Sequence, residues 1–261
     1  MFDFSWLTDP NAWVALATLT LLEIVLGIDN IAFLSILVDR LPEAQRKMGR
    51  LFGLSLAMLT RLLLLTTIAW ITRLKATLFS IPIAQPLWKM MPDARANAGM
   101  LDMTGRGLIL LLGGIFLIWK ATQEIHRSLE GDDKPAPPAT AANFISVLAQ
   151  IALIDIIFSL DSVITAVGMA DHLSVMALAV VFSVGIMMLA AAPIGDFVSR
   201  HPSVKMLALS FLLLIGTALI AEGLHFEIPK GYIYFAMAFS LGVEMLNLRV
   251  RTRSGPPTAH S

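Results

Sequence analysis

The chain has 261 residues, of which 57% are hydrophobic and only 15% are charged, and its acidic and basic residues balance. A soluble domain has about 45–50% apolar and about 25% charged residues, so this composition indicates an integral membrane protein. The zero net charge gives no sign of a nucleic-acid partner, and the absence of cysteine excludes disulfides, thiolate metal ligands and thiol catalysis.

Seven apolar segments are long enough to cross a bilayer, whose hydrocarbon core of ~30 Å needs about 20 helical residues. Each is predicted to be an α-helix, because lipid offers no hydrogen-bond partner to an unpaired backbone group. The expected fold class is therefore an all-α membrane protein with seven transmembrane helices. The segments are 12–38, 50–72, 106–124, 142–168, 173–194, 204–222 and 229–248.

The basic residues predict the orientation of the helices. The first ten residues, MFDFSWLTDP, contain no Lys or Arg, so we expect no secretory signal and a first segment that is retained. Basic residues are concentrated in the loops after the first, third and fifth segments and in the tail, which places the N-terminus outside and the C-terminus in the cytoplasm. These residues are Arg40, Arg46, Lys47, Arg50, Lys120, Arg127, Lys134, Arg200, Lys205, Arg249, Arg251 and Arg253.

Two connections and the tail interrupt the apolar pattern. The connection 73–106 contains LFSIPIAQPLWKMM, which is too short to span and is expected to be a Pro-broken interfacial or re-entrant piece, with an irregular loop as the alternative. The Pro- and Ala-rich stretch at 128–141 predicts a linker between two halves of the transmembrane domain 1–248. Residues 249–261 are expected to form a disordered cytoplasmic tail.

The two halves resemble each other in sequence. EIVLGIDN at 23–30 aligns with DIIFSLDS at 155–162, and LLLGGIFLIWK at 110–120 aligns with LLLIGTALIAE at 212–222. Each repeat would hold three spans, an odd number, so the second repeat enters the membrane from the opposite side. We therefore expect an inverted 3+3 repeat, as in many secondary transporters. Its parts would be repeat 1 at about 12–127, repeat 2 at about 142–222 and a seventh helix at about 229–248.

Carboxylates stand at equivalent places in the two repeats. Glu23 aligns with Asp155 and Asp29 aligns with Asp161, while Asn30 aligns with Ser162. Six residues advance a regular helix by about 600°, so the two acids of one motif point about 120° apart. Two arrangements would still bring all four acids together. The helices would cross around a polar pocket, or each would unwind near its middle, at Gly27 or Ser159.

Burial of these acids in a membrane requires a partner. One charged Asp at mid-bilayer costs about 2.5–3.5 kcal/mol, so the four acids must face each other, a cation or water. Carboxylate, amide and hydroxyl oxygens suit Mn²⁺, Mg²⁺ or Ca²⁺, and the predicted metal ligands are Glu23, Asp29, Asn30, Asp155, Asp161 and Ser162. The alternative is that such acids are structural hydrogen-bond partners.

Several other residues have two interpretations each. Arg61 is either a structural counter-ion or a charge that empties the site during transport. Glu222 is either a gate or proton carrier, or an interfacial acid. Lys120 and Glu124 are expected to be interfacial caps, and the 14 Met residues are expected to fill space between helices rather than bind copper.

The two acidic motifs, LLEIVLGIDN and LIDIIFSLDSV, resemble the paired motifs of the TerC family of integral membrane proteins. GRGLILLLGGIFLIWKATQEIH and AEGLHFEIPKGYIYFAMAFSLGVEMLN also resemble that family, closest to its YgdQ/YoaE-like branch, although Gly107 stands where an Asp is expected in TGRDL. The resemblance covers residues 5–248. It implies seven spans, kinship with lysine-exporter-like transporters, a bacterial inner membrane, an association with tellurite resistance and, for several members, manganese efflux.

The function expected from these observations is a secondary transporter that exports a divalent cation, Mn²⁺ in the first place, in exchange for protons. It would need no cofactor and would not be an enzyme, since no GxxxxGK[ST] motif is present and no His lies in the expected pocket. Two alternatives stay open. One is a membrane scaffold or tellurite-stress protein without transport, and the other is an exporter of an amino acid or another small molecule.

Overall fold

The structure is a computed structural model that describes residues 5–67, 77–82, 100–130, 141–169, 172–226 and 228–253. These residues form mainly α-helices, with one 3₁₀ turn, η1 (Ser5–Thr8), before the first of them. The α-helices of the described residues are α1 (Pro10–Val38), α2 (Glu43–Thr66), α6 (Gly105–Glu130), α7 (Ala141–Met169), α8 (Leu173–Arg200), α9 (Pro202–Gly223) and α10 (Lys230–Arg253). Strands β1 (Thr77–Pro82) and β2 (Met100–Thr104) form a hairpin before α6.

The helix ends follow from local sequence. Asp9 caps α1, because its side chain accepts a hydrogen bond at 2.9 Å from the backbone N–H of Asn11, and Pro10 occupies the first turn, where its missing N–H costs nothing. Pro202 likewise opens α9. The helices also extend beyond several of the predicted apolar segments, with α6 reaching Glu130 and α10 reaching Arg253. An apolar run marks only the part of a helix that crosses hydrocarbon, and charged turns continue it into the interface.

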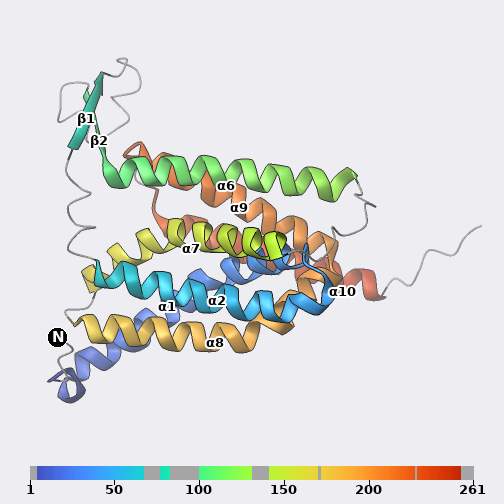
Figure 1. Ribbon diagram of the computed structural model, residues 1–261, viewed down its shortest axis with the longest axis horizontal. Coiled ribbons are helices and arrows are strands. Elements are labelled where there is room, and N and C mark those ends of the chain that lie inside the picture. The colour runs from blue at the N-terminus through green and yellow to red at the C-terminus, as the bar shows by residue number, and fades with distance from the viewer. Residues whose placement is uncertain are drawn as a thin grey trace, which may run out of the picture.

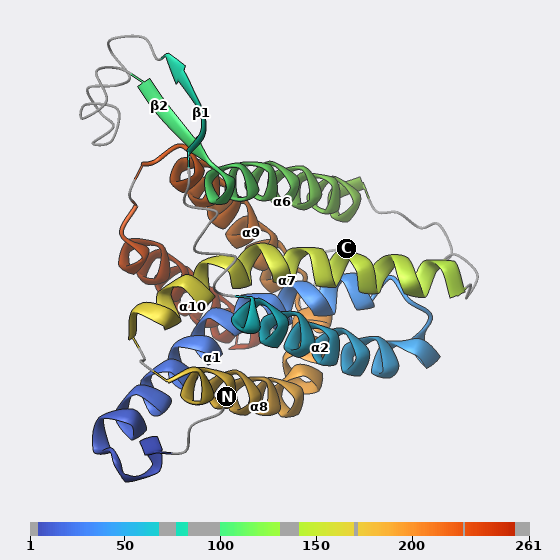
Figure 2. The same cartoon turned by 60° about the vertical axis from the view of Figure 1, so that its left-hand side comes forward.

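The helices lie in three groups that run roughly along one axis. Figures 1 and 2 show α6 and α9 on one side, α1, α2 and α8 on the other, and α7 between them. The start of α1 and the hairpin lie at one end of the bundle, and the end of α10 lies at the other (Figure 1). By the distribution of basic residues, the end with the hairpin is the predicted outer end.

The helices pack in three main pairs, which are α1 with α8, α2 with α7, and α6 with α9. In the first pair, a Cβ at Gly195 would lie 2.7 Å from Ser35 Oγ, and Ser199 Oγ donates a hydrogen bond at 2.5 Å to Asp39 Oδ2. Both contacts join residues 160 apart in sequence, so α1 and α8 run parallel.

The pair α6 and α9 meets through glycines. A Cβ at Gly114 would lie 2.5 Å from the Gly216 carbonyl oxygen, and a Cβ at Gly107 would lie 2.9 Å from that of Gly223. Side chains are excluded there because the two backbones touch, as at other small-residue contacts between membrane helices. The glycine at position 107, where the resemblance predicted Asp, is therefore part of this close contact.

Five described helices, α2, α6, α8, α9 and α10, are long and apolar enough to cross a membrane, and α1 is a sixth if its two bent halves form one span. In α7 the described apolar stretch is Phe144–Ser159. All seven predicted segments thus coincide, over their described residues, with α-helices. α10 packs on α9 and exposes most of its surface, as a lipid-facing helix does.

The part of the long connection that the structure describes is regular, which differs from the irregular loop considered as the alternative. Residues 78–82 of the expected interfacial or re-entrant piece belong to β1, which pairs antiparallel with β2. β1 is exposed, whereas Leu101 and Met103 of β2 are buried against Leu108 and Phe226. The run Leu78–Phe79–Ser80–Ile81 suits an exposed strand. Pro82 has no N–H to donate to a partner strand, and it is tolerated because it stands at the end of an edge strand. Residues 83–91 of the predicted piece lie outside the described residues.

Candidate cation site

A buried arginine joins two of the predicted acids. Arg61, near the C-terminal end of α2, donates from Nη1 to Glu23 Oε2 on α1, and from Nη2 and Nε to Asp155 Oδ1 on α7, at 3.1 and 3.2 Å. Exposed fractions are only 4% for Glu23, 4% for Asp155 and 3% for Arg61. The pairing of position 23 with position 155 in the repeat alignment therefore corresponds to an ion triad in three dimensions.

The second oxygen of Asp155 is held by hydroxyl groups. Thr60 Oγ1 donates to Asp155 Oδ2 at 3.1 Å, and Ser159 Oγ donates to the same atom at 3.2 Å. Thr60 was not predicted as a site residue, because a threonine next to a charged residue in a membrane helix does not by itself indicate a site. Ser159 was recognised only as the equivalent of Gly27.

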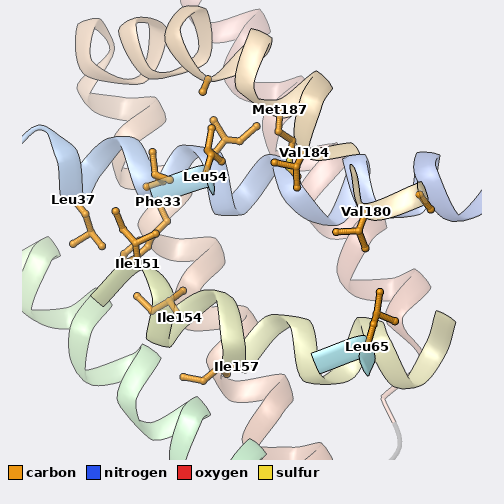
Figure 3. Packing of buried hydrophobic residues seen from close by; sticks show 14 of the residues in the cluster. Phe33, Leu37, Leu54, Leu65, Ile151, Ile154, Ile157, Val180, Val184 and Met187 are labelled. Atoms are coloured by element: carbon orange, nitrogen blue, oxygen red, sulfur yellow. The ribbon is translucent and has the colours of Figure 1, made fainter. Parts of the chain in front are cut away.

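A small cavity adjoins the triad. Its volume is about 30 Å³, enough for one or two water molecules. Its polar lining comes from Asn30, Arg61 and Asp155, and its apolar lining comes from Phe33, Leu34, Leu54, Ala57, Ile151, Ile154, Val184 and Met187. Figure 3 shows several of these apolar side chains, including Phe33, Leu54 and Met187, around the ribbons of α1, α7 and α8.

The amide of Asn30 is incompletely satisfied. Its Nδ2 is buried and has no hydrogen-bond partner among the described residues. A buried polar atom of this kind requires a partner such as water or a ligand, and the cavity is where one would lie. Since the two ends of an amide are assigned from the hydrogen-bond network, the reverse orientation would present Oδ1, an oxygen ligand suited to a cation.

α1 bends at the site. Its halves, Pro10–Val25 and Asn30–Val38, meet at 41°, and every residue between them keeps helical backbone. α1 therefore does not unwind near Gly27, and α7 is helical throughout Ala141–Met169, including Ser159. The unwinding considered from sequence is therefore absent from the described backbone at Gly27 and Ser159, and of the four acids the structure brings together Glu23 and Asp155.

Three of the predicted ligands have side chains that lie outside what the structure describes, namely Asp29, Asp161 and Ser162. Among the described side chains, Glu23 and Asp155 come together with Arg61, and Asn30 lines the adjoining cavity. No group of three or more His, Cys, Asp or Glu able to hold a metal ion forms within this described part. A full set of carboxylate ligands for a metal would therefore need Asp29 or Asp161.

Glu222 lies away from this triad. Its Oε1 accepts a hydrogen bond at 2.5 Å from Arg106 Nη2, at the end of the bundle that carries the hairpin. Both side chains are more than one-quarter exposed. Glu222 is thus a paired acid at the predicted outer end, a position that fits an interfacial acid or an outer gate but not a ligand of the central site.

Lys120 and Glu124, which were expected to be interfacial caps, are both buried in the second half of α6. Glu124 pairs with Arg40 from the turn between α1 and α2, so this acid has a partner from another part of the chain. Burial, and then the nearby charge of Arg127, lower the pKa of Arg40 to about 10, so this guanidinium stays charged at neutral pH.

The triad carries two negative charges and one positive charge. Removal of Arg61 would leave two buried carboxylates, which match the charge of one divalent cation. With the guanidinium in place the triad keeps a net charge of −1, whereas a divalent cation in place of the guanidinium would leave no net charge.

Comparison with known proteins identifies the family of this chain. The family model of the integral membrane protein TerC family matches residues 8–255. This chain belongs to the TerC family. The predicted resemblance is thus confirmed over nearly the whole chain, and the match includes every residue of the triad.

Curated relatives place TerC-family members of this kind in the inner membrane. The UPF0053 inner membrane protein YgdQ of Escherichia coli (strain K12) is 57% identical over 253 residues, which are 97% of this chain and 99% of that protein. A UPF0053 protein of Haemophilus influenzae is 54% identical over 249 residues, 95% of this chain and 98% of the relative. The UPF0053 inner membrane protein YoaE of Escherichia coli is 47% identical over 243 residues but is matched over only 44% of its own length. No solved structure matches the chain.

This TerC-family chain is accordingly a multi-pass inner membrane protein. The names of the relatives describe location and family and give no substrate. The chemistry of the site must therefore be argued from its residues.

Proposed function

We propose that this protein is a secondary transporter that exports a divalent metal cation, with Mn²⁺ as its substrate. The observation that carries the proposal is the burial of two carboxylates from different helices, Glu23 and Asp155, around the guanidinium of Arg61. Ionisable residues inside a membrane bundle are costly to insert and therefore rare, and those that are present commonly mark ion pathways. Asp29 and Asp161, from the same two motifs, would complete the set of oxygen ligands.

The position of the cavity supports an inward-open entrance. Phe33 and Leu34 follow Asn30 in α1, and Leu54 and Ala57 precede Arg61 in α2, so the cavity lies on the side of the triad that faces the α1–α2 turn. That turn is at the predicted cytoplasmic end. On the opposite side of the triad, Leu19, Leu65 and Val180 are buried in the apolar core. An exporter loads its substrate from the cytoplasm, and this arrangement suits that step.

The packing of the helices supports the inverted repeat on which alternating access would depend. In the repeat alignment α1 corresponds to α7 and α2 corresponds to α8. The symmetry that relates the repeats therefore converts the pair α1 with α8 into the pair α7 with α2. Both pairs are major contacts, and the pair α6 with α9 is converted into itself. We propose seven spans, with the N-terminus outside, the C-terminus in the cytoplasm and α10 outside the repeat.

Arg61 would neutralise one of the two carboxylate charges when no metal is bound. During export the cation would displace the guanidinium from Glu23 and Asp155, and the guanidinium would return once the cation had left. Protons taken up by the remaining acids would complete the exchange. This cycle needs no resident cofactor and no catalytic nucleophile, and we propose no enzymatic activity.

The size of the cavity favours an ion over the alternative of an amino acid. A volume of about 30 Å³ holds a dehydrated or partly hydrated cation, whereas an amino acid would require the helices to separate. The remaining alternative, a scaffold without transport, would use the triad only as a structural connection between α1, α2 and α7. That alternative is separated from transport by experiment.

The test is Mn²⁺ uptake into proteoliposomes that contain a quenched internal dye. Wild type would be compared with Asp155→Asn and with Asp196→Asn, a control in which the altered acid is half-exposed and pairs with Arg50 at the end of α8. Uptake by wild type and the control alone would support a carboxylate pathway, and an imposed pH gradient would then test proton coupling. Silence of all three folded proteins toward Mn²⁺, Mg²⁺ and Ca²⁺ would favour the scaffold. Equal uptake by all three would mean that the cation passes elsewhere.

A further inference from the structure

One methionine lies against the bend in α1. A Cβ at Gly27 would lie 2.2 Å from Met187 Sδ and 3.2 Å from its Cε, so the absence of a side chain at Gly27 is what admits the thioether of α8. Gly27 stands between the two halves of α1 that meet at 41°. Met187 is only 4% exposed. Its sulfur therefore lies against the backbone of α1 at Gly27, which is four residues after Glu23 and three before Asn30.

The same side chain lines the cavity beside the triad. Met187 shares the lining with Asn30, Arg61 and Asp155, whereas the other lining residues are hydrocarbon. Figure 3 shows Met187 extending from α8 toward α1, with Val184 one turn earlier on the same helix. A cation that replaced the guanidinium in this cavity would thus meet oxygen ligands and one thioether.

A thioether changes which cations such a site prefers. Mg²⁺ and Ca²⁺ are hard cations that take oxygen ligands almost exclusively, and a sulfur atom in place of an oxygen or a water weakens their binding. First-row transition-metal ions accept softer ligands, and their affinity for N, O and S sites rises along the series from Mn²⁺. Carboxylates alone would not separate Mn²⁺ from Mg²⁺ by ligand type.

We infer that Met187 is a specificity-determining ligand, whose thioether selects transition-metal divalent ions against Mg²⁺ and Ca²⁺ in the site of Glu23 and Asp155. This inference rests on the proposed function, because it assigns the substrate class of that same site. It also gives Gly27 a role, which is to let the thioether reach the bend. From sequence alone Met187 belonged with the other methionines as filling between helices, and only the cavity and the contact at Gly27 distinguish it.

The test compares Met187→Leu with Met176→Leu. Leucine is close to methionine in volume and lacks the sulfur, and Met176 is buried on the same helix but does not line the cavity. Affinities for Mn²⁺ and Mg²⁺ would be measured on the purified full-length proteins by titration calorimetry. Metal-edge X-ray absorption of the Mn²⁺-loaded proteins would report a sulfur neighbour directly. A second variant, Gly27→Ala, would push the thioether away by its new Cβ.

The expected result is a Mn²⁺/Mg²⁺ affinity ratio that falls roughly tenfold in Met187→Leu, the low end of what loss of a supporting contact costs a metal site. Gly27→Ala should also lower the ratio, and Met176→Leu should leave it unchanged. The sulfur neighbour should disappear in Met187→Leu and Gly27→Ala and remain in Met176→Leu. An unchanged ratio in Met187→Leu, or a wild-type spectrum without sulfur, would overturn the inference. Absence of metal binding by wild type would overturn it together with the proposed function. Selective binding without uptake into proteoliposomes would overturn transport alone and leave Met187 as a ligand.

Discussion

The two places where helices of the first repeat pack against helices of the second differ in chemistry. Where α1, α2 and α7 meet, charged side chains are buried around an incompletely filled cavity, and α1 is bent. Where α6 and α9 meet, glycines bring the backbones into contact and leave no room for even a methyl group. The first contact holds charged groups around a cavity, whereas the second is closed by backbone contact. Under the proposed function, α6 and α9 would be a fixed element against which the ion site rearranges.

The largest expected effect comes from removing the central charge. Arg61→Ala leaves Glu23 and Asp155 buried without a counter-ion, and such a loss costs about 3–5 kcal/mol of the free energy of unfolding. Added Mn²⁺ should restore much of that stability, because a cation that binds only the folded state shifts the equilibrium toward it. The measurement is denaturant-induced unfolding in detergent micelles, with and without Mn²⁺.

The matched control for that variant is Arg50→Ala. Arg50 pairs with Asp196 at 3.0 Å, and the Asp196 side chain is 55% exposed, so water replaces the lost partner and the cost is about 0–1 kcal/mol. Equal destabilisation by the two arginine variants would contradict the special burial of the triad. Recovery of the Arg50 variant by Mn²⁺ would contradict the assignment of the metal effect to Glu23 and Asp155.

The second effect tests the rigid crossing. Gly114→Ala places a methyl group 2.5 Å from the Gly216 carbonyl oxygen and 3.0 Å from the Ile220 nitrogen, both of them backbone atoms that cannot turn away. We expect a loss of about 1–3 kcal/mol in the free energy of unfolding. Mn²⁺ should not rescue it. Gly185→Ala on α8, where a Cβ would meet nothing within 4 Å, should change stability by no more than about 0.5 kcal/mol. Similar melting curves for the two variants would show that α6 and α9 can separate at little cost.

The smallest effect probes the hydroxyl groups that hold Asp155. Thr60→Val keeps the shape of the side chain but removes the donor to Asp155 Oδ2, with an expected loss of about 1 kcal/mol. Because the carboxylate would then be less firmly oriented, the KM for Mn²⁺ uptake should rise more than kcat falls. Thr217→Val is the comparison, since that exposed hydroxyl donates to the Leu213 carbonyl of its own helix. A change in KM for both threonine variants would argue against a specific role for Thr60.

The residues of the charged crossing were predictable from sequence to different degrees. Glu23, Asp155 and Arg61 stand out because a charge in an apolar segment must have a partner, and the repeat pairs the two acids. Thr60 and Met187 could not be inferred in the same way, since both residue types are tolerated anywhere in a membrane helix. Their roles depend on which side chains of other helices lie beside them.

The ends of the helices were less predictable than their middles. Lys120 and Glu124 look like interfacial residues in sequence, yet both are buried, and Glu124 pairs with Arg40 of the turn between α1 and α2. The hairpin of β1 and β2 was also missed, because its strands are separated by a stretch whose length hides their pairing. Apolar periodicity reports what faces lipid or core, and it carries little information about loops that fold back onto the bundle.

The arrangement of the triad also bears on the order in which the chain is made. Glu23 and Arg61 are 38 residues apart, whereas Arg61 and Asp155 are 94 apart. α1 and α2 are translated before α7, and they carry opposite charges that can neutralise each other as the two helices enter the bilayer. Asp155 is translated later, when the guanidinium that it contacts is already part of the chain. Two helices with balanced charges are expected to cost less to insert together than either would alone.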